Sequence, residues 1–295
     1  MKLLNTYREP AQLEEAEHHS RTPAQAYDLN WCYTLPVGPL QTPGGVRLVP
    51  LIPSLHAPRL HKLFSDYPEG FLYLPYGPFP TYASFLTNLE ERRREPGTFL
   101  FVAYDLALEF DDEKDGREEE LREERIAGIV GLLKSAPVNR MTEIGHLHIP
   151  APFQRTHVLT HSIAILLRWL LSPPAPHAGS FPPGLGLRRV QWYANSLNIP
   201  SIRAAQRLGL ALETTHVAWD RVVLPGKQGV PVPAYIEGAY REEEERVGTG
   251  RHSAVLAIGW DDWHEKGGRE RVEALVEGRP VTRRKAKEVP GLVLA

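Results

Sequence analysis

The residue types that could carry out chemistry gather in one short stretch near the middle of the chain. Glu143, His146 and His148 follow one another along a predicted strand, and a carboxylate or an imidazole can accept a proton from a nucleophile. The segment Gln154–Thr160 lies between this strand and a predicted helix. Backbone N–H groups and the dipole at such a helix N-terminus favour an anion. The stretch therefore combines candidate proton acceptors with a candidate anion-binding loop.

Other chemical motifs are absent from the sequence. The histidines show no His-Glu-x-x-His pattern or other metal spacing, so we expect no metal site. The fragment Gly184-Leu185-Gly186 lacks the strand-to-helix context of a dinucleotide-binding loop, and no Gly-x-Ser-x-Gly nucleophile motif occurs. Cys32 is the single cysteine, which excludes an intrachain disulfide and suits a reducing compartment.

The composition is that of an ordinary globular protein. The 295 residues are 42% hydrophobic and 24% charged, and the formal net charge of −2 offers no global field for nucleic acid. The N-terminus does not resemble a secretory signal, and the longest apolar run, Ile163–Leu171, is too short to span a bilayer. We therefore expect a cytoplasmic protein with no nucleic-acid or membrane partner.

The hydrophobic pattern alternates between strand and helix periods and predicts an α/β fold. The predicted strands cover residues 46–52, 98–106, 126–133, 142–149, 187–193, 211–219 and 253–260. The predicted helices cover residues 54–65, 81–94, 158–171 and 201–208. We predict one domain over residues 45–263, with charged insertions near 109–124 and 224–250. Residues 1–44 form a predicted N-terminal extension, and residues 264–295 a C-terminal helix and tail.

This order of elements resembles that of the GNAT (Gcn5-related N-acetyltransferase) superfamily. The likeness is strongest over residues 126–221 and extends more weakly from Gly44 to Trp263. The segments that carry it are Ile126–Gly131, Glu143–Ile149, Pro152–Thr160, Arg188–Trp192 and Asn195–Gly209. Within the superfamily the chain is most similar to the Rim-like ribosomal-protein N-terminal acetyltransferases. The resemblance implies a mixed, mostly antiparallel sheet with a splayed strand pair, flanked by helices, and an acyltransferase that uses acetyl-CoA.

The resemblance also implies where acetyl-CoA binds. Its pyrophosphate would lie at the helix N-terminus, and its amide-bearing pantetheine arm would pair with a free strand edge. The family loop normally reads Gln/Arg-x-x-Gly-x-Gly/Ala, but His157 and Leu159 occupy the glycine positions here, and Arg155 and His157 could instead contact phosphate. The implied cofactor-binding residues are Leu147, His148, Ile149, Gln154, Arg155, Thr156, His157, Val158, Leu159, Thr160, Asn198 and Ser201.

The implied reaction is direct transfer of an acetyl group to a primary amine in a ternary complex. Glu143 is the candidate base, at a strand position where relatives place a carboxylate, and His146 is the alternative. In a regular strand these two side chains would point to opposite faces. Ala205 stands where many members have a tyrosine that protonates the thiolate. Ser201 could take that role, or it could be the N-cap of its helix.

The acceptor pocket would be lined by aromatic side chains, with which an amine could make cation–π contacts. The candidates are Tyr73, Tyr76, Phe79, Tyr82 and Trp219. The acceptor could be a small-molecule amine or a peptide N-terminus, and the protein could be a monomer or a homodimer. Two alternatives stay open: an O-acyltransferase, and a catalytically silent CoA-binding or scaffold module. The missing tyrosine and loop glycines favour the silent module.

Overall fold

The computed structural model describes residues 3–8, 11–111, 121–174, 182–237, 249–278, 281 and 283–290. The strands are β1 (Leu40–Gln41), β2 (Val46–Pro50), β3 (Phe99–Asp105), β4 (Leu108–Glu109), β5 (Ile126–Ala136), β6 (Met141–His148), β7 (Arg189–Asn195), β8 (Ala211–Val223), β9 (Thr249–Gly259) and β10 (Arg284–Lys285). The helices are α1 (Pro53–Asp66), α2 (Tyr82–Arg94), α4 (Val158–Leu171), α5 (Ile199–Arg207), α6 (Ala234–Glu237), α8 (Trp260–His264) and α9 (Gly268–Gly278).

Within the described residues, eight strands form one sheet in the order β1-β2-β3-β5-β6-β7-β9-β8. All neighbours pair antiparallel except β6 and β7, which run parallel. This arrangement confirms the predicted mixed, mostly antiparallel sheet. A two-residue pairing of β4 with β10 brings the C-terminal segment back to the main body.

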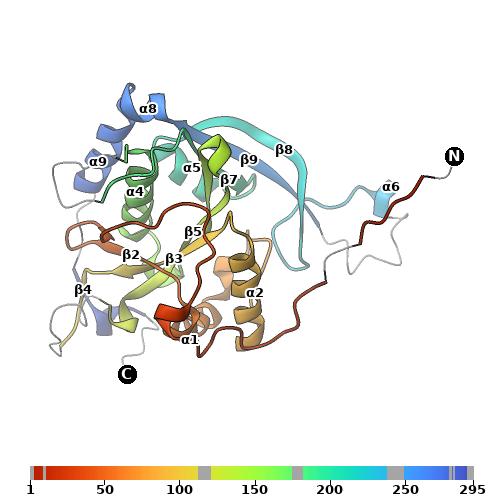
Figure 1. The fold of residues 1–295 in the computed structure, drawn as a ribbon, viewed down its shortest axis with the longest axis horizontal. Helices are drawn as coiled ribbons and strands as arrows, with labels where there is room; N and C mark the ends of the chain where they lie inside the picture. Colours follow the sequence, from red (N-terminus) through yellow and green to blue (C-terminus); the bar gives the residue numbers. More distant parts are fainter. Residues whose placement is uncertain are drawn as a thin grey trace.

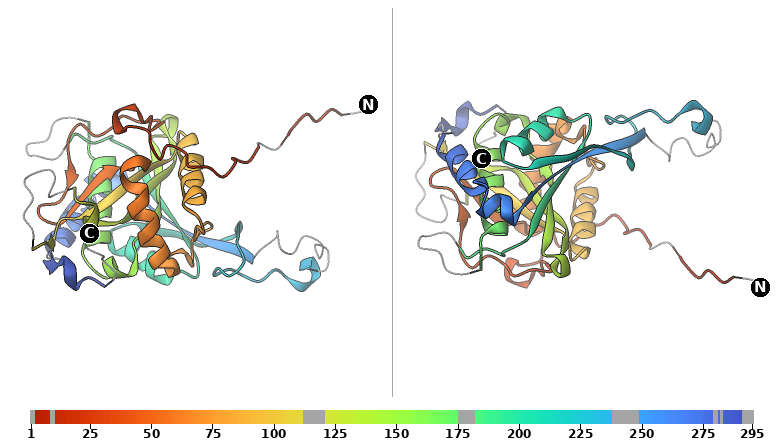
Figure 2. Two further views of the ribbon diagram at one scale, coloured as in Figure 1. Left: turned by 90° about the horizontal axis from the view of Figure 1, so that it is seen from below. Right: turned by 90° about the horizontal axis from the view of Figure 1, so that it is seen from above.

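Helices cover both faces of the sheet. Figures 1 and 2 show α1 and α2 on one face and α4, α5, α8 and α9 on the other. Helix α4 is apolar on nearly all sides because it lies between the sheet and α9. Trp169, Trp192 and Phe101 are among the largest side chains of the buried core.

Most predicted elements are present, with shifted ends. Helix α5 begins at Ile199, and the hairpin of β8 and β9 is longer than predicted, extending to Val223 and starting again at Thr249. Figure 2 shows this hairpin projecting beyond the rest of the sheet. Much of the predicted insertions lies outside the described residues: 112–120 of the first and 238–248 of the second.

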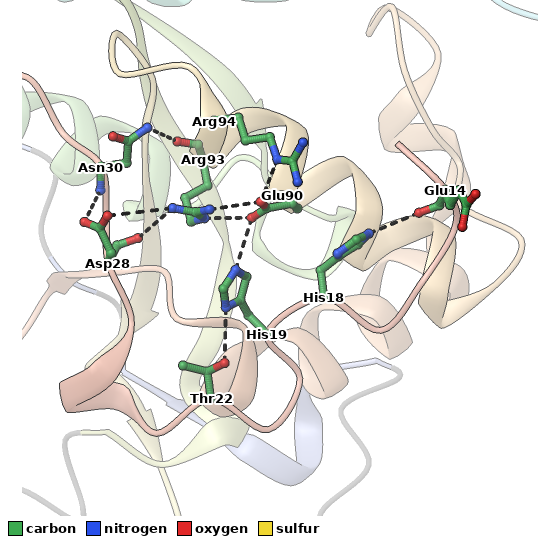
Figure 3. Close-up of polar contacts among 9 residues, drawn as sticks. All are labelled: Glu14, His18, His19, Thr22, Asp28, Asn30, Glu90, Arg93 and Arg94. Carbon is green, nitrogen blue, oxygen red and sulfur yellow. Dashed lines mark hydrogen bonds and ion pairs between the residues drawn. The ribbon is translucent and has the colours of Figure 1, made fainter. Parts of the chain in front are cut away.

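The N-terminal segment runs along α2 and is fastened to it by a buried carboxylate (Figure 3). Glu90 is 4% exposed and accepts hydrogen bonds from Nε of Arg93 at 2.7 Å and Nε of Arg94 at 2.8 Å. Nε2 of His19 lies 3.3 Å from the same carboxylate. Asn30 donates to the backbone carbonyl of Arg93 at 2.7 Å. Glu90 thus holds the N-terminal segment at His19, and the Arg93 carbonyl holds it at Asn30.

We expect Glu90→Gln to lower the free energy of unfolding by about 2 kcal/mol, because charge-assisted hydrogen bonds are lost. Burial opposes ionisation, yet the hydrogen bonds from Arg93 and Arg94 lower the pKa of Glu90 to about 2. Its stabilisation is therefore present above pH 4.5, the ordinary value, and is lost as the pH falls toward 2. Urea unfolding at pH 7 and pH 3 measures this, with the exposed neighbour Glu91→Gln as the control. Equal stability of both variants at pH 7 would show that the contacts of Glu90 with His19, Arg93 and Arg94 do not stabilise the fold.

Candidate functional site

Strands β6 and β7 part midway along their length. Their pairing runs from Met141 opposite Arg189 to Ile144 opposite Trp192, and it ends there. Strand β6 continues to His148, while β7 continues to Asn195 against β9 on its other side. The last four residues of β6 therefore have no strand partner on the β7 side. Such an edge can pair with the amides of an extended ligand.

A β-bulge at His146 changes which side chains share a face. His146 has a φ of 47°, and the β5–β6 register shifts between Ile129 and Gly131. A Cβ atom added to Gly131 would lie 3.0 Å from Cβ of His146, and one added to Gly145 would lie 3.1 Å from Leu133, the partner of Glu143. Because the extra residue resets the alternation, Glu143 and His146 both face α1 and α2. The expectation of opposite faces, drawn from a regular strand, was wrong.

Glu143 is buried in this position, with only 2% of its surface exposed. Nζ of Lys134 lies 3.0 Å from Oε2 of Glu143, and the same Nζ stands 4.3 Å from the centre of the Tyr193 ring. Burial raises the pKa of Glu143 above its ordinary value, against the opposing effects of Lys134, Arg221 and Arg251. A carboxylate with a raised pKa is a stronger proton acceptor near neutral pH.

The two histidines of β6 are neutral in this environment. Nδ1 of His146 forms a hydrogen bond with the Tyr76 hydroxyl at 2.9 Å. Burial, with Arg92 and Arg221 nearby, lowers the pKa of His146 to about 3. His148 is enclosed by the Phe64 and Phe71 rings, and burial lowers its pKa to about 3 as well. Such imidazoles are weak bases, so the geometry favours Glu143 over His146.

A small aromatic pocket of about 20 Å³ lies beside these histidines, large enough for one water molecule. Its lining includes two predicted acceptor residues, Tyr76 and Phe79, whose rings stack with centroids 6.3 Å apart. Tyr82 instead packs against His61, outside the pocket lining. Tyr73 is half-buried in the loop before Tyr76 and does not line the pocket either.

Trp219 lies away from this group. It has a φ of 51° and lies in the last of the three register shifts between β8 and β9. Its ring packs against Gly250 and His252. Those two residues alternate along β9 with Arg251, so they point to the opposite face of the sheet from the predicted acceptor side. The predicted place of Trp219 in the acceptor pocket is therefore not what the structure shows, because bulges in β8 changed its orientation.

The loop before α4 is held by its own side chains. Nε2 of Gln154 donates to the carbonyl of Ile149 at 2.9 Å. The Thr156 hydroxyl donates to the Phe153 carbonyl at 2.6 Å and accepts from the N–H of Val158 at 3.2 Å. Arg155 is exposed and has a φ of 60°, the region that favours glycine. Gln154 and Thr156 thus shape the loop, and Arg155 presents its side chain to solvent.

His157 turns inward rather than toward a ligand. Its φ of −71° and ψ of −21° are helical, so this family glycine position does not require glycine. Nε2 of His157 lies 3.2 Å from Oδ1 of Asp105 and 3.3 Å from the Gly45 carbonyl oxygen. The expected side-chain contact of His157 with phosphate is therefore replaced by a buried pair with Asp105. Its backbone remains at the N-terminus of α4.

Asp105 also connects this loop to the C-terminal segment. Arg284 donates from Nη2 to Oδ2 of Asp105 at 2.8 Å and from Nη1 to the Pro152 carbonyl at 3.0 Å. The N–H of Ala107 donates to Oδ1 of Asp105 at 2.9 Å. One carboxylate therefore holds the loop at Pro152 and at His157. Sequence reasoning missed Asp105 and Arg284, since no local pattern links positions so far apart.

Helix α5 begins beside the point where β6 and β7 part. Asn198 is its N-cap and accepts from the N–H of Ser201 at 3.2 Å, so Ser201 itself is not the cap. The Ser201 hydroxyl accepts from Nε1 of Trp192 at 3.1 Å, which leaves its own proton to donate elsewhere. By strand alternation, Trp192 faces away from Glu143. Ser201 and Glu143 therefore approach the parted strands from opposite faces, while Ala205 is fully buried.

Basic side chains from one helix and three strands accompany Glu143 and His146. Arg92 comes from α2, Lys134 from β5, and Arg221 and Arg251 from the paired strands β8 and β9. We call these four residues the basic cluster. Lys134 lies 3.0 Å from Glu143, and Arg92 lies 5.3 Å from the centre of the Tyr76 ring, whose hydroxyl is hydrogen-bonded to His146. Arg221 is the cross-strand partner of Arg251, and the charges of both act on the pKa values of Glu143 and Tyr76. No local pattern predicted this grouping, because it arises from the pairing of β8 with β9 and from the packing of α2 against the sheet.

The described residues hold neither a membrane-spanning helix nor a metal-binding group. None of their helices combines the length and the apolar character needed to cross a membrane. They also contain no group of three or more His, Cys, Asp or Glu side chains arranged to hold a metal ion.

Solved structures of acetyltransferases resemble this chain over most of its length. A probable GNAT-family acetyltransferase from Chromobacterium violaceum is 21% identical, with 89% of this chain and 98% of that chain covered and a TM-score of 0.56. A Gcn5-related N-acetyltransferase from Brucella melitensis is 19% identical over 84% and 92%, with a TM-score of 0.57. RimJ from Mycobacterium smegmatis, solved with CoA-disulfide, is 16% identical over 82% and 94%, with a TM-score of 0.51.

No family model and no curated protein sequence matches the chain. The structural likeness, at these low identities, shows that the chain has the GNAT fold. The fold predicted from the order of strands and helices is thereby confirmed.

Proposed function

We propose that this protein is an acetyltransferase that transfers the acetyl group of acetyl-CoA to a primary amine, directly and within a ternary complex. The observation that carries the proposal is the parting of β6 and β7 beside a buried carboxylate, Glu143, with a raised pKa. The parted edge is suited to an amide-bearing arm, and the carboxylate to an amine proton. The GNAT fold of the chain supports the same reaction class.

The residues around the parted strands fit acetyl-CoA. The free edge of β6 at Leu147 and His148 would pair with the pantetheine amides, and Asn198 stands at the start of the facing helix. The N–H groups at the start of α4 and the exposed Arg155 would hold the pyrophosphate. The bound cofactor supplies an activated acetyl thioester. The CoA-disulfide in the RimJ structure supports this assignment.

Each side chain then has a distinct task. Glu143 would accept the proton of the attacking amine, because it is buried and its pKa is raised. A backbone N–H of β6 after Ile144 would stabilise the oxyanion. Ser201 would donate its hydroxyl proton to the leaving thiolate from the other face of the sheet. His146, held by Tyr76, would line the acceptor side without acting as the base.

We expect acetyl-CoA to bind with a dissociation constant in the micromolar range, about −8 kcal/mol. Isothermal calorimetry with acetyl-CoA measures the affinity, and the melting temperature should rise with the ligand concentration. Free adenine nucleotides are the control for nonspecific binding of phosphates. No heat and no thermal stabilisation at millimolar acetyl-CoA would contradict the proposal. Binding without turnover of any amine or hydroxyl acceptor would favour the silent CoA-binding module.

A further inference from the structure

Two arginines occupy directly opposed positions on the outermost strands. Arg221 of β8 is the cross-strand partner of Arg251 of β9. Opposed like charges destabilise a strand pair, so an unbound protein gains nothing from this arrangement. Asp220 lies beside the pair: its Oδ2 is 3.5 Å from Nε of Arg221 and accepts from the Ser253 hydroxyl at 2.7 Å. Asp220 therefore forms an ion pair with Arg221 but not with Arg251.

Arg251 is the more unusual of the two because it is buried and hydrogen-bonded to a neutral hydroxyl. Only 5% of its surface is exposed, and its Nε donates to the neutral Ser253 hydroxyl at 3.1 Å. Among the described residues no ion pair of this guanidinium is found, and Asp220 and Glu143 act on it through their charge without direct contact. Burial and the neighbouring Arg221 lower the pKa of Arg251 to about 10. A buried cation of this kind is costly unless an anion completes it.

The other two cations of the basic cluster, Arg92 and Lys134, also have few negative charges nearby. The guanidinium of Arg92 lies 5.3 Å from the centre of the Tyr76 ring, and its nearest carboxylate, Glu95, is 3.8 Å away and largely exposed. Lys134 pairs with Glu143. Among the described residues, the four cations thus face Glu143, Asp220 and the exposed Glu95, while His146 stays neutral. The surroundings of Glu143 carry a net positive charge.

We propose that the amine acceptor carries a carboxylate or a phosphate, which binds between Arg221 and Arg251 while its amine lies at Glu143. This inference rests on the proposed acetyl transfer and names the class of acceptor. Paired arginines are suited to either anion because a guanidinium can donate two parallel hydrogen bonds to it. A polycationic acceptor is disfavoured because it would meet the same four cations.

The charges also help the chemistry. Amine attack requires the neutral form, and nearby positive charge lowers the pKa of an ammonium group. The basic cluster would therefore increase the fraction of free amine, while the anion of the same molecule supplies the binding energy. Glu143 then receives a proton that is already weakly held.

The test compares matched amines with the full-length protein and acetyl-CoA. β-Alanine is compared with β-alaninamide, and phosphoethanolamine with ethanolamine, which separates carboxylate from phosphate; spermidine is the polycationic probe. We expect the anionic member of at least one pair to have a kcat/KM about 10- to 100-fold higher, the value of a hydrogen-bonded charge. Arg251→Met should remove that preference and leave the acetyl-CoA affinity unchanged, while turnover of the neutral amine should fall by a smaller factor than turnover of the anionic one.

Two further variants keep the test decisive. Arg221→Gln removes the partner guanidinium at a side chain that is 33% exposed, so it should fold even if Arg251→Met does not. Lys62→Gln removes one positive charge from an exposed site on α1 and should change nothing. Equal turnover of the anionic and neutral amines, or a preference for spermidine, would overturn this inference while acetyl transfer stands. Absence of acetyl-CoA binding in calorimetry would overturn the proposed function and this inference with it.

Discussion

Glu143→Gln is expected to lower the rate of acetyl transfer by about 100- to 10,000-fold, the usual effect of removing a general base. The glutamine preserves shape and hydrogen bonding, but it cannot accept the proton of the amine. The dissociation constant of acetyl-CoA should barely move, because Glu143 faces α1 and α2 whereas the loop before α4 holds the pyrophosphate. Steady-state turnover with the best amine and calorimetry with acetyl-CoA measure the two effects separately.

The pH profile gives an independent reading of the same residue. Glu143 acts only when it is deprotonated, and burial raises its pKa above the ordinary value of 4.5. In the wild-type protein kcat/KM should therefore fall as the pH drops through this raised pKa. This fall of kcat/KM at low pH, the acidic limb of the pH profile, should be missing from the residual activity of Glu143→Gln. If the acidic limb persisted unchanged in Glu143→Gln, the titrating group would be a residue other than Glu143.

His146→Ala is the matched control for the base. The pKa of His146, about 3, makes its imidazole a poor proton acceptor at neutral pH. We therefore expect a smaller loss of rate and a retained acidic limb. If Glu143→Gln kept full activity while His146→Ala lost it, the roles would be reversed. If both variants stayed fully active, the basic cluster alone would supply the free amine.

How far the sequence predicted this site depended on whether the deciding contacts were local. The order of strands and helices follows hydrophobic periodicity, which is local, and the α/β class could be predicted from it; the GNAT fold was implied by the resemblance of that order and of the motifs to the family. The bulge at His146 could not, because its φ of 47° is set by pairing with β5. That one residue decides whether Glu143 and His146 share a face. The sequence therefore identified both residues but not their relation.

The residues missed altogether depend on contacts between distant segments. Arg221 and Arg251 become neighbours only when β8 pairs with β9, and Asp105 of β3 meets His157 only because α4 packs against the sheet. His157 is an example: its place in the loop suggested a phosphate contact. Its side chain instead turns inward to the buried carboxylate of Asp105, which is far from it in the sequence. Burial and tertiary charge determined what local patterns left open.

Asp105→Asn is expected to lower the free energy of unfolding by about 3 to 5 kcal/mol, the cost of breaking a buried ion pair by removing one partner. Asp105 is 0% exposed and accepts from Arg284 and Ala107, and it lies beside His157. Burial raises its pKa, but His157, Ala107 and Arg284 outweigh that effect and leave the pKa lowered. Its stabilisation is therefore present above pH 3.8, the ordinary value, and is lost as the pH falls further.

The same substitution should weaken acetyl-CoA binding, because Asp105 holds both ends of the loop before α4. At one end, Arg284 donates a hydrogen bond to the Pro152 carbonyl; at the other, His157 contacts Asp105 directly. We expect about a tenfold rise in the dissociation constant, equal to 1.4 kcal/mol. Calorimetry well below both melting temperatures separates this loss from unfolding. Arg284→Met should reproduce the weaker binding with a smaller loss of stability, since it removes only one arm.

Asp66→Asn provides the control for removing a carboxylate from an ion pair. Asp66 pairs with Lys62 on the exposed side of α1, so the change should cost about 0.5 kcal/mol or less and leave acetyl-CoA affinity unchanged. If Asp105→Asn behaved like Asp66→Asn, the loop would hold its shape through Gln154 and Thr156 alone. If it lost stability but kept full affinity, the Asp105 network would support the fold without shaping the cofactor loop.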